Sequence, residues 1–211
     1  MVGDVMIDGY LEGDVGRTSP EAPVPVVLSK NTRHVAGGAA NVANNLRALG
    51  SHVTLAGFTG DDAEGKTLAH LVQAAGIEHC FVKDPSRPTT YKLRIVAQNQ
   101  HMLRIDRESK NLATAAMTDA LWNKIEPLLA RVDGVVVSDY AKGVVGISLM
   151  NRLIAEATKL GLKVCVDPKG RDYSRYRGAY MITPNRREVG EAAQRNIDLP
   201  EDFQQAVAEL K

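Results

Sequence analysis

The chain has 211 residues, of which 44% are hydrophobic and 24% are charged. These values are typical of a globular protein with one main domain, and they exclude an intrinsically disordered chain. The 26 Lys and Arg residues nearly balance the 25 Asp and Glu residues, and this net charge of +1, without a basic cluster, argues against a nucleic-acid-binding protein held by phosphate contacts.

The first quarter of the chain alternates apolar runs with amphipathic stretches. Residues 2–7 predict a strand that ends just before Asp8. The proline-rich residues 11–34 predict an edge strand or a loop, because proline cannot donate a hydrogen bond in the middle of a sheet. A helix is expected over 37–50, with glycines at both ends, followed by a strand over 52–58.

The next stretch changes from a helical to a strand period. Asp61 or Asp62 caps a predicted helix that ends at Gly76, and residues 78–82 predict a short strand. Residues 89–106 then alternate between apolar and polar side chains on either side of a short polar turn. This pattern predicts a β-hairpin with one polar face.

After the hairpin the alternation of strands and helices resumes. The predicted elements are a helix over 117–131, a strand over 134–139, a helix over 148–160, strands ending at Asp167 and Thr183, and helices beginning after Asn185 and at Pro200. Such alternation predicts an α/β fold with a mostly parallel sheet covered on both faces. The hairpin and the proline-rich segment form a small β accessory, interpreted as a lid.

Polar residues follow several of the predicted strands. Ligands of open α/β sheets bind beyond the carboxyl ends of the strands, so we expect a binding site at this edge of the sheet. Four strands that deliver acids and amides to one edge supply more polar groups there than a stable core needs. These residues are Asp8, Asp139, Asp167, Lys169, Asn185 and Glu188.

Residues 60–67, GDDAEGKT, match the phosphate-binding P-loop pattern G-x-x-x-x-G-K-[ST]. Asp61, Asp62 and Glu64 argue against that function, since carboxylates within about 5 Å of a triphosphate repel it at a cost of several kcal/mol. The same acids are favoured at a helix N-terminus. We therefore favour an ordinary helix start and keep a P-loop NTPase as an alternative.

Two motifs permit either a structural or a ligand-binding role. Residues 37–43, GGAANVA, fit close helix packing through small residues, or a close approach of the backbone to a ligand with Asn41 turned toward it. Lys92 and Arg94 lie on one strand face, about 7 Å apart. They form either a solvated face or a clamp for a phosphorylated substrate.

Two further motifs lie at predicted strand ends. Residues 185–188, NRRE, fit an N-cap with a glutamate in the first turn, or an amide and a carboxylate that organise Mg²⁺ and nucleotide phosphates. Residues 167–170, DPKG, fit a simple turn, or a loop whose Lys169 meets a phosphate. The local sequence leaves both roles open.

Several other classes of protein are excluded. No apolar run approaches the roughly 20 residues of a membrane-spanning helix, and no signal peptide is recognisable. Cys80 and Cys165 lie far apart without a CxxC motif, and the five histidines show no metal-ligand spacing. We expect a cytoplasmic protein without a membrane partner, a disulfide or a zinc site.

Taken together, GGAANVA, GDDAEGKTL and NRRE resemble signatures of the PfkB/ribokinase superfamily of sugar kinases. Within it, GDVMIDGY, RTSPEAPVPVV, SDYAKG, DPKGRDYSRYRGA and TPNRRE resemble the D-glycero-D-manno-heptose 7-phosphate kinase family, including the kinase half of the bifunctional heptose kinase/adenylyltransferase. The resemblance covers nearly all of the chain. It implies a ribokinase-like three-layer α/β sandwich with a mostly parallel sheet and a small β lid over about 11–34 and 87–106.

The resemblance also implies a reaction: transfer of the ATP γ-phosphoryl group, with Mg²⁺, to O1 of heptose 7-phosphate for ADP-heptose and lipopolysaccharide core synthesis. A homodimer through the β lid is implied as well. The implied sugar-side residues are Asp8, Arg17, Gly37, Gly38, Asn41, Lys92, Arg94, Asp139 and Lys142. The implied nucleotide-side residues are Lys169, Asn185 and Glu188, with Glu188 acting indirectly on Mg²⁺.

One signature of the family is not found. Its D-T-G-A-G-D segment, which carries the catalytic aspartate, does not occur up to Lys211. We therefore expect residues 1–211 to form a partial kinase domain that lacks its C-terminal nucleotide-binding part and is inactive as it stands. The alternatives are a non-catalytic short form that binds a sugar phosphate, and another PfkB-family sugar kinase such as a fructokinase.

Overall fold

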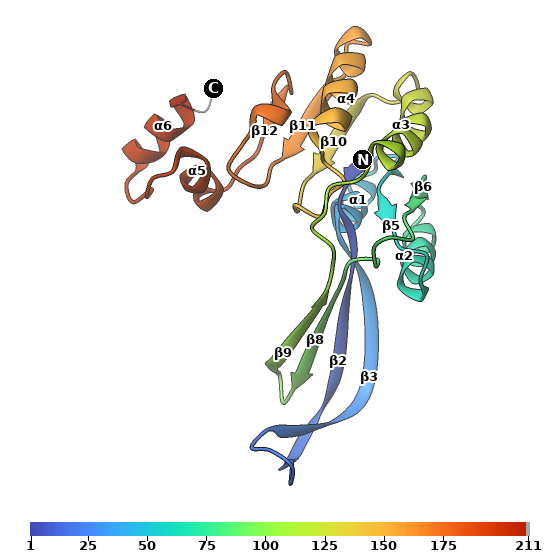
Figure 1. Ribbon diagram of the computed structural model, residues 1–211, viewed down its shortest axis with the longest axis vertical. Helices are drawn as coiled ribbons and strands as arrows, with labels where there is room; N and C mark the ends of the chain where they lie inside the picture. Colours follow the sequence, from blue (N-terminus) through green and yellow to red (C-terminus); the bar gives the residue numbers. More distant parts are fainter. Residues whose placement is uncertain (210–211) are drawn as a thin grey trace.

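The computed structural model describes residues 1–209, which form an α/β body and a long β lid that extends from it (Figure 1). Four strands of the body pair in parallel in the order β1-β10-β11-β12. They are β1 (Val2–Gly3), β10 (Gly134–Ser138), β11 (Lys163–Asp167) and β12 (Met181–Ile182). Because the pairing is parallel, the carboxyl ends of β10 and β11 open at the same edge.

Two pairs of very short parallel strands extend the body beside β1, to which a bridge between Val2 and Ala56 links them. Residues 52–58 and 78–82 were each expected to form one strand, but each segment forms two short strands separated by residues outside the regular strand pairing. The pairs are β4 (Thr54–Leu55) with β6 (Glu78–His79), and β5 (Phe58–Thr59) with β7 (Val82–Lys83).

Helices cover this sheet and enclose two hydrophobic cores. One core joins α3 and α4 to Val137 and Val166 of the sheet, and the other joins α1 and α2 to Val5 and Ile7. The helical elements are α1 (Ala39–Ala48), α2 (Ala63–Ala74), α3 (Ala115–Leu129), α4 (Ile147–Lys159), the 3-10 turn η1 (Ser174–Tyr176), α5 (Arg186–Ala193) and α6 (Pro200–Glu209). The predicted helices are confirmed to within a few residues.

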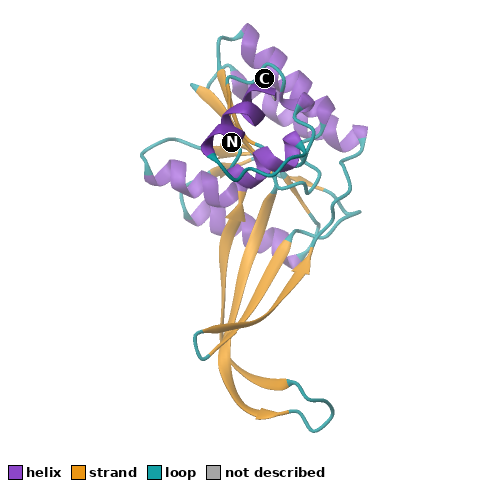
Figure 2. Cartoon of the chain, turned by 90° about the vertical axis from the view of Figure 1, so that its left-hand side faces the viewer, coloured by secondary structure: helices purple, strands orange, loops and turns teal. Residues whose placement is uncertain are grey.

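The lid is a four-stranded sheet in the order β3-β2-β8-β9, which Figure 2 shows as long strands leaving the helical body. Strand β2 is parallel to β8, and the other two pairs are antiparallel. The strands are β2 (Val5–Thr18), β3 (Pro25–Gly38), β8 (Tyr91–Ala97) and β9 (Gln100–Arg107). Gln98 and Asn99 have positive φ angles and close the predicted hairpin with a two-residue turn.

The two faces of the lid differ in polarity, because side chains alternate along each strand and partners in register share a face. The polar face carries Asp8, Tyr10, Lys92, Arg94, Arg104 and Asp106. The opposite face carries Leu11, Leu93, Ile95, Leu103 and Ile105. Leu103 and Ile105 are 57% and 48% exposed.

The proline-rich segment differs from its prediction. The first strand does not end before Asp8, since β2 continues without interruption to Thr18. Asp8 therefore lies inside a lid strand rather than at the carboxyl end of a body strand. Pro20 and Pro23 lie in the connection between β2 and β3, and Pro25 is the first residue of β3, where a missing N–H costs least.

Within residues 1–209, no helix combines the length and the apolar character needed to cross a bilayer. Cys80 and Cys165 are both free thiols in the structure.

Candidate functional site

The floor of the site is formed where β2 and β3 leave the body. A Cβ on Gly37 would overlap Asp8 Oδ2, so the missing side chain leaves room for this carboxylate in its present position. Gly38 caps α1 with a φ of +57°, and a Cβ there would lie 2.4 Å from the Asp4 carbonyl oxygen. Asn41 is exposed in the first turn of α1. The backbone at Gly37 thus lies directly against the Asp8 carboxylate.

Asp8 has a cationic partner on the neighbouring lid strand. Arg94 donates from its guanidinium to Asp8 Oδ1 at 2.6 Å, and the two side chains are about one-fifth exposed. The Arg94 guanidinium also lies 5.3 Å from the centre of the Tyr10 ring. The structure therefore brings the expected sugar-binding aspartate and one expected phosphate ligand into direct contact.

Lys92, the other member of the expected phosphate clamp, meets the expected sugar-side residue Lys142 at a carboxylate. Lys92 Nζ lies 3.2 Å from Glu108 Oε2, and Lys142 Nζ lies 2.7 Å from Glu108 Oε1. Lys92 also donates to Asp106 at 3.1 Å. Lys142 belongs to the loop after β10, whereas Lys92 belongs to the lid, so Glu108 joins the lid to the body.

A buried aspartate holds the loop that carries Lys142. Asp4 is 1% exposed, and its carboxylate accepts backbone hydrogen bonds from Tyr140, Lys142 and Val144 at 2.8, 3.0 and 3.1 Å. Burial raises the pKa of Asp4, while these three donors act in the opposite direction. The contacts fix the loop between β10 and α4 against the start of β2.

Asp139 lies in a different, buried cluster. Its side chain is 2% exposed and accepts from Tyr176 Oη at 2.7 Å, from the Ala141 N–H at 2.7 Å and from Arg175 at 2.8 Å. These donors tie η1 to the end of β10. In this arrangement Asp139 is shielded from the sugar side, so a contact with substrate would require it to give up one of these partners.

The expected nucleotide-side residues lie together at the start of α5. Asn185 accepts from the Glu188 N–H at 3.0 Å, and Glu188 Oε2 accepts from the Asn185 N–H at 2.9 Å, which is a capping box. Lys169 Nζ donates to Glu188 Oε1 at 2.9 Å, and this hydrogen bond raises the pKa of Lys169. The Lys169 side chain is 44% exposed, so it remains accessible.

These residues do not by themselves form a magnesium site. Both Glu188 oxygens already accept hydrogen bonds, and residues 1–209 contain no group of three His, Cys, Asp or Glu side chains placed to hold a metal ion. Burial, and then the nearby charge of Glu188, raise the pKa of Asp167. An indirect role of Glu188 toward Mg²⁺ therefore stays a prediction.

Comparison with known proteins identifies the family to which the chain belongs. The family model described as "pfkB family carbohydrate kinase" matches residues 2–211. The chain belongs to the pfkB family of carbohydrate kinases. The family expected from the sequence motifs is thereby confirmed.

Curated relatives of this PfkB-family chain carry the name "Bifunctional protein HldE". The protein from Methylobacillus flagellatus is 49% identical over 197 residues, which cover 91% of this chain and 40% of that protein. The protein from Helicobacter pylori is 42% identical over 212 residues, covering all of this chain and 46% of that protein. The chain thus spans less than half the length of these relatives, and their name agrees with the narrower resemblance to the bifunctional heptose kinase/adenylyltransferase.

Solved structures confirm the expected fold. The tetrameric inhibited form of phosphofructokinase-2 from Escherichia coli has a TM-score of 0.72 at 17% identity, over 99% of this chain and 69% of that one. Arabidopsis thaliana ribokinase complexed with ribose and ATP has a TM-score of 0.67 at 19% identity, over 99% and 66%. The PfkB-family chain therefore has the predicted ribokinase-like α/β architecture.

Arg17 is not brought to the site of this PfkB-family chain. It pairs with Val26 near the tip of the lid. Nine residues of strand separate it from Asp8, which corresponds to about 30 Å. Within one chain Arg17 therefore does not meet the cluster formed by Asp8, Arg94, Lys92 and Lys142.

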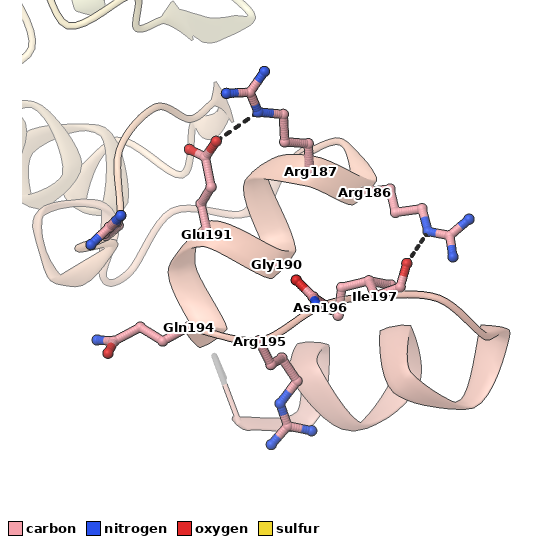
Figure 3. Close-up of a pocket in the computed structure, with 9 residues that line it drawn as sticks. Arg186, Arg187, Gly190, Glu191, Gln194, Arg195, Asn196 and Ile197 are labelled. Carbon is pink, nitrogen blue, oxygen red and sulfur yellow. Dashed lines mark hydrogen bonds and ion pairs between the residues drawn. The ribbon is translucent and has the colours of Figure 1, made fainter.

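A groove lined by arginines lies along α5 and the segment that follows it, away from the lid (Figures 1 and 3). Arg186 donates to the Ile197 carbonyl oxygen, and Arg187 donates to Glu191, both at 2.7 Å. Arg195 binds Glu209 at 2.6 Å. Three of its arginines thus fasten the helical segment itself. The lining residues are Arg171, Arg186, Arg187, Gly190, Glu191, Gln194, Arg195, Asn196 and Ile197.

The P-loop interpretation of residues 60–67 is wrong. Asp62 caps α2 by accepting from the Gly65 N–H, and its carboxylate also accepts from the N–H and the hydroxyl of Thr89. The Gly60 N–H donates to the Thr89 hydroxyl. Backbone donors that would cradle a phosphate are therefore used inside the protein, and the segment is an ordinary helix start in this PfkB-family chain.

The sequence analysis missed three residues at the site. Asp4 lies in an apolar run, where an acid without charged neighbours in sequence signals a buried acceptor. Glu108 follows a strand and gives no local signal. Tyr140, within SDYAKG, is 36% exposed at the end of β10, and burial followed by the charges of Asp167 and Asp8 raises its pKa, so it remains protonated.

Proposed function

We propose that this chain forms the sugar-binding part of a kinase that transfers the γ-phosphoryl group of ATP to O1 of heptose 7-phosphate. The observation that carries the proposal is the meeting of Lys92 and Lys142 at Glu108, on the lid face where Arg94 contacts Asp8. The hydroxyl groups of a neutral sugar need only hydrogen-bond partners. A phosphate already on the sugar is an anion, and it favours a site with several cations. The product, heptose 1,7-bisphosphate, would serve ADP-heptose and lipopolysaccharide core synthesis.

The residues divide the substrate between them. Asp8 accepts hydrogen bonds from sugar hydroxyls, and the backbone at Gly37 and Gly38 approaches the ring closely because neither residue carries a Cβ. Asn41 adds an amide to the same side. Lys92, with Arg94 and Lys142 beside it, neutralises the 7-phosphate.

The nucleotide side contributes positioning and charge. Lys169 is placed to meet an ATP phosphate at the start of α5, and the capping box of Asn185 and Glu188 fixes that helix start. Mg²⁺ enters with ATP and neutralises phosphate charge. Phosphoryl transfer relies mainly on positioning and charge neutralisation, which is the contribution that these residues make. No residue of this chain is assigned as the catalytic base.

We also propose a homodimer through the lid, in the cytoplasm. The apolar lid face, defined by Leu11, Leu93, Ile95, Leu103 and Ile105, has no partner among the described residues. A second copy offers a face of the same kind, and two such faces bury one another in a symmetric contact. The free thiols of Cys80 and Cys165 fit a reducing compartment.

The function is tested by calorimetric titration of residues 1–211 with heptose 7-phosphate and with heptose. We expect saturable binding of the phosphorylated sugar, at least about tenfold tighter than that of heptose. Asp8→Asn weakens both, whereas Asp14→Asn, which changes an exposed lid carboxylate, changes neither. Tighter binding of fructose 6-phosphate would instead assign another sugar kinase of the family.

Turnover is assayed on the longest natural protein that contains this chain. Incubation with ATP, Mg²⁺ and heptose 7-phosphate, followed by ³¹P NMR, should show a second phosphate on the sugar at O1. Binding of heptose 7-phosphate without any turnover in that protein would contradict the kinase proposal and support the non-catalytic alternative.

A further inference from the structure

Glu108 stands at the junction of lid and body, just after the end of β9. Its two carboxylate oxygens bind different lysines, with Oε1 at 2.7 Å from Lys142 Nζ and Oε2 at 3.2 Å from Lys92 Nζ. All three side chains are largely enclosed, with exposed fractions of 13–16%. This is the arrangement in which two ammonium groups hold one anion between them.

Glu108 occupies this position as an anion. Burial acts to raise its pKa, but the hydrogen bonds from Lys142 and Lys92 outweigh burial, and the pKa of Glu108 is lowered. Lys110 approaches the same carboxylate more loosely, at 3.9 Å. The lysines are therefore already neutralised before any ligand arrives.

A phosphate group and the Glu108 carboxylate cannot share these lysines as the structure stands. Asp106 already takes another contact of Lys92, and Arg94 is held by Asp8. A phosphate dianion that reached Lys92 and Lys142 would lie within about 4 Å of the carboxylate, where like charges repel strongly in a partly enclosed site. The carboxylate must leave for the phosphate to enter.

We propose that Glu108 is an internal substitute for the substrate phosphate, and that the sugar phosphate binds by displacing it from Lys92 and Lys142. The proposal rests on the function proposed above, in which these lysines receive the phosphate. Glu108 thereby acts as a positioning and specificity residue. It keeps both ammonium groups in place in the empty site, and it weakens the binding of anions that cannot replace it.

The exchange also changes what connects the lid to the body. In the empty site, Lys142 of the body is tied to the lid through Glu108. When the phosphate replaces the carboxylate, the tie runs through the ligand. A sugar without a phosphate leaves the Glu108 contacts intact, so the exchange distinguishes phosphorylated from unphosphorylated sugars.

Inorganic phosphate is the probe for this inference, because its binding does not depend on which sugar the site accepts. Titrations followed by ³¹P NMR compare the unmodified chain with Glu108→Gln and Glu108→Ala. We expect phosphate to bind about fivefold more tightly to both variants, as the competing ion pairs are removed. Glu156→Gln is the matched control, since it removes an exposed glutamate–lysine pair on α4 and should leave phosphate binding unchanged.

Unchanged or weaker phosphate binding by both folded Glu108 variants would overturn the inference, because a carboxylate that only orients the lysines cannot compete with the ligand. Absence of phosphate binding in all four proteins would overturn it as well. Circular dichroism melts identify a variant that fails to fold, and the second substitution then decides. Titration with heptose 7-phosphate is a separate measurement, so failure of the proposed sugar specificity would be distinguished from failure of the exchange.

Discussion

At the scale of single residues, Asp4 connects more of the site than any side chain that faces it. Besides its three carboxylate contacts, its N–H donates to the Ser138 carbonyl oxygen and its own carbonyl oxygen accepts from the Ala39 N–H. One residue thereby joins the end of β10, the start of α1 and the loop that carries Lys142. The position of Lys142 follows from this buried acceptor rather than from its own contacts alone.

Asp4→Ala should be strongly destabilising. The substitution leaves three backbone N–H groups, one buried and two partly buried, without an acceptor. Each such loss costs about 1–3 kcal/mol, so we expect about 3 kcal/mol or more in total. Urea unfolding measures the change. Asp14→Asn, on the exposed part of the lid, should stay within about 0.5 kcal/mol of the unmodified chain. Equal losses for both substitutions would contradict the role given to Asp4.

Gly37→Ala tests whether the floor of the site depends on the missing side chain. The new Cβ overlaps Asp8 Oδ2 and displaces the carboxylate from Arg94. We expect heptose 7-phosphate to bind at least about tenfold more weakly, and stability to fall by about 1–3 kcal/mol through overpacking.

The control for this substitution is Gly16→Ala in the outer part of the neighbouring strand β2, where a Cβ would meet no atom within 4 Å. Its affinity and stability should match those of the unmodified chain. If Gly37→Ala behaves in the same way, the Asp8 carboxylate has room to spare and the close approach at Gly37 is not required.

At the scale of elements, α5 combines an N-terminal cap with the ATP-binding role proposed for its first turn. Its capping box can be preserved while the charge of its N-terminus changes, because Asp and Asn are about equally good N-caps. We expect Asn185→Asp to leave the unfolding midpoint nearly unchanged and to weaken ATP binding several-fold, since it adds a negative charge where phosphates are proposed to lie. Fluorescence titration with a labelled ATP analogue measures the affinity. A weakened helix with unchanged affinity would indicate a purely structural cap.

The local elements could be predicted because their signals are local. Helix α2 has its cap in Asp62, and the β8–β9 hairpin has alternating polarity and a two-residue turn. The continuation of β2 through Asp8 could not be predicted in this way. Strand β2 pairs with β3 along its whole length, and around Asp8 it also pairs with β8, which lies more than eighty residues further along the chain.

The same reasoning separates the site residues. Asp8, Lys92 and Arg94 could be named from motif and strand period, and the structure brings them together. Glu108 could not be named, because a glutamate in a connecting segment acquires meaning only when Lys142 and Lys92 are folded against it. Arg17 could be named from a motif, but only the length of β2 shows how far it lies from the rest.

At the scale of the whole molecule, several carboxylates should make the fold sensitive to acid. Burial acts to raise their pKa values, but hydrogen bonds and nearby cations lower them below the ordinary values of 3.8 for Asp and 4.5 for Glu. A carboxyl group whose pKa is lower in the folded chain stabilises the fold when ionised. These groups are Asp62, Asp84, Asp106 and Glu108.

This stabilisation is complete above the unfolded pKa values and is lost as the pH falls through the lower folded values. We therefore expect the free energy of unfolding to decrease as the pH falls below about 4.5. Asp4 and Asp167, whose pKa values are raised, contribute with the opposite sign. Urea unfolding between about pH 3 and about pH 6 measures how the free energy of unfolding changes when both sets of carboxylates titrate. A free energy of unfolding that does not change with pH would contradict this expectation, because the carboxylates with lowered and with raised pKa values would then cancel.

The lid-mediated dimer is also a property of the whole molecule. Replacing Ile105 with a charged residue, Ile105→Lys, places an ammonium group in the proposed contact between two lids, and we expect dimers to dissociate. Sedimentation velocity measures the change in mass. Leu49→Lys is the control, because Leu49 is 84% exposed at the end of α1 and lies outside the lid. Dissociation by both substitutions, or by neither, would contradict a contact through the lid face.

Strand β2 runs from the body to the outer part of the lid, so a small rotation at its base produces a larger displacement at its tip. The first residues of β2 are buried in the body, Asp8 lies near the base of the lid, and Arg17 lies about 30 Å further out. A tilt of the strand by only about 10° at the base of the lid would therefore move its tip by about 5 Å. An adjustment of the Asp8 carboxylate around the proposed sugar would therefore be amplified at the far end of the strand, where a spectroscopic label would report it without touching the ligand.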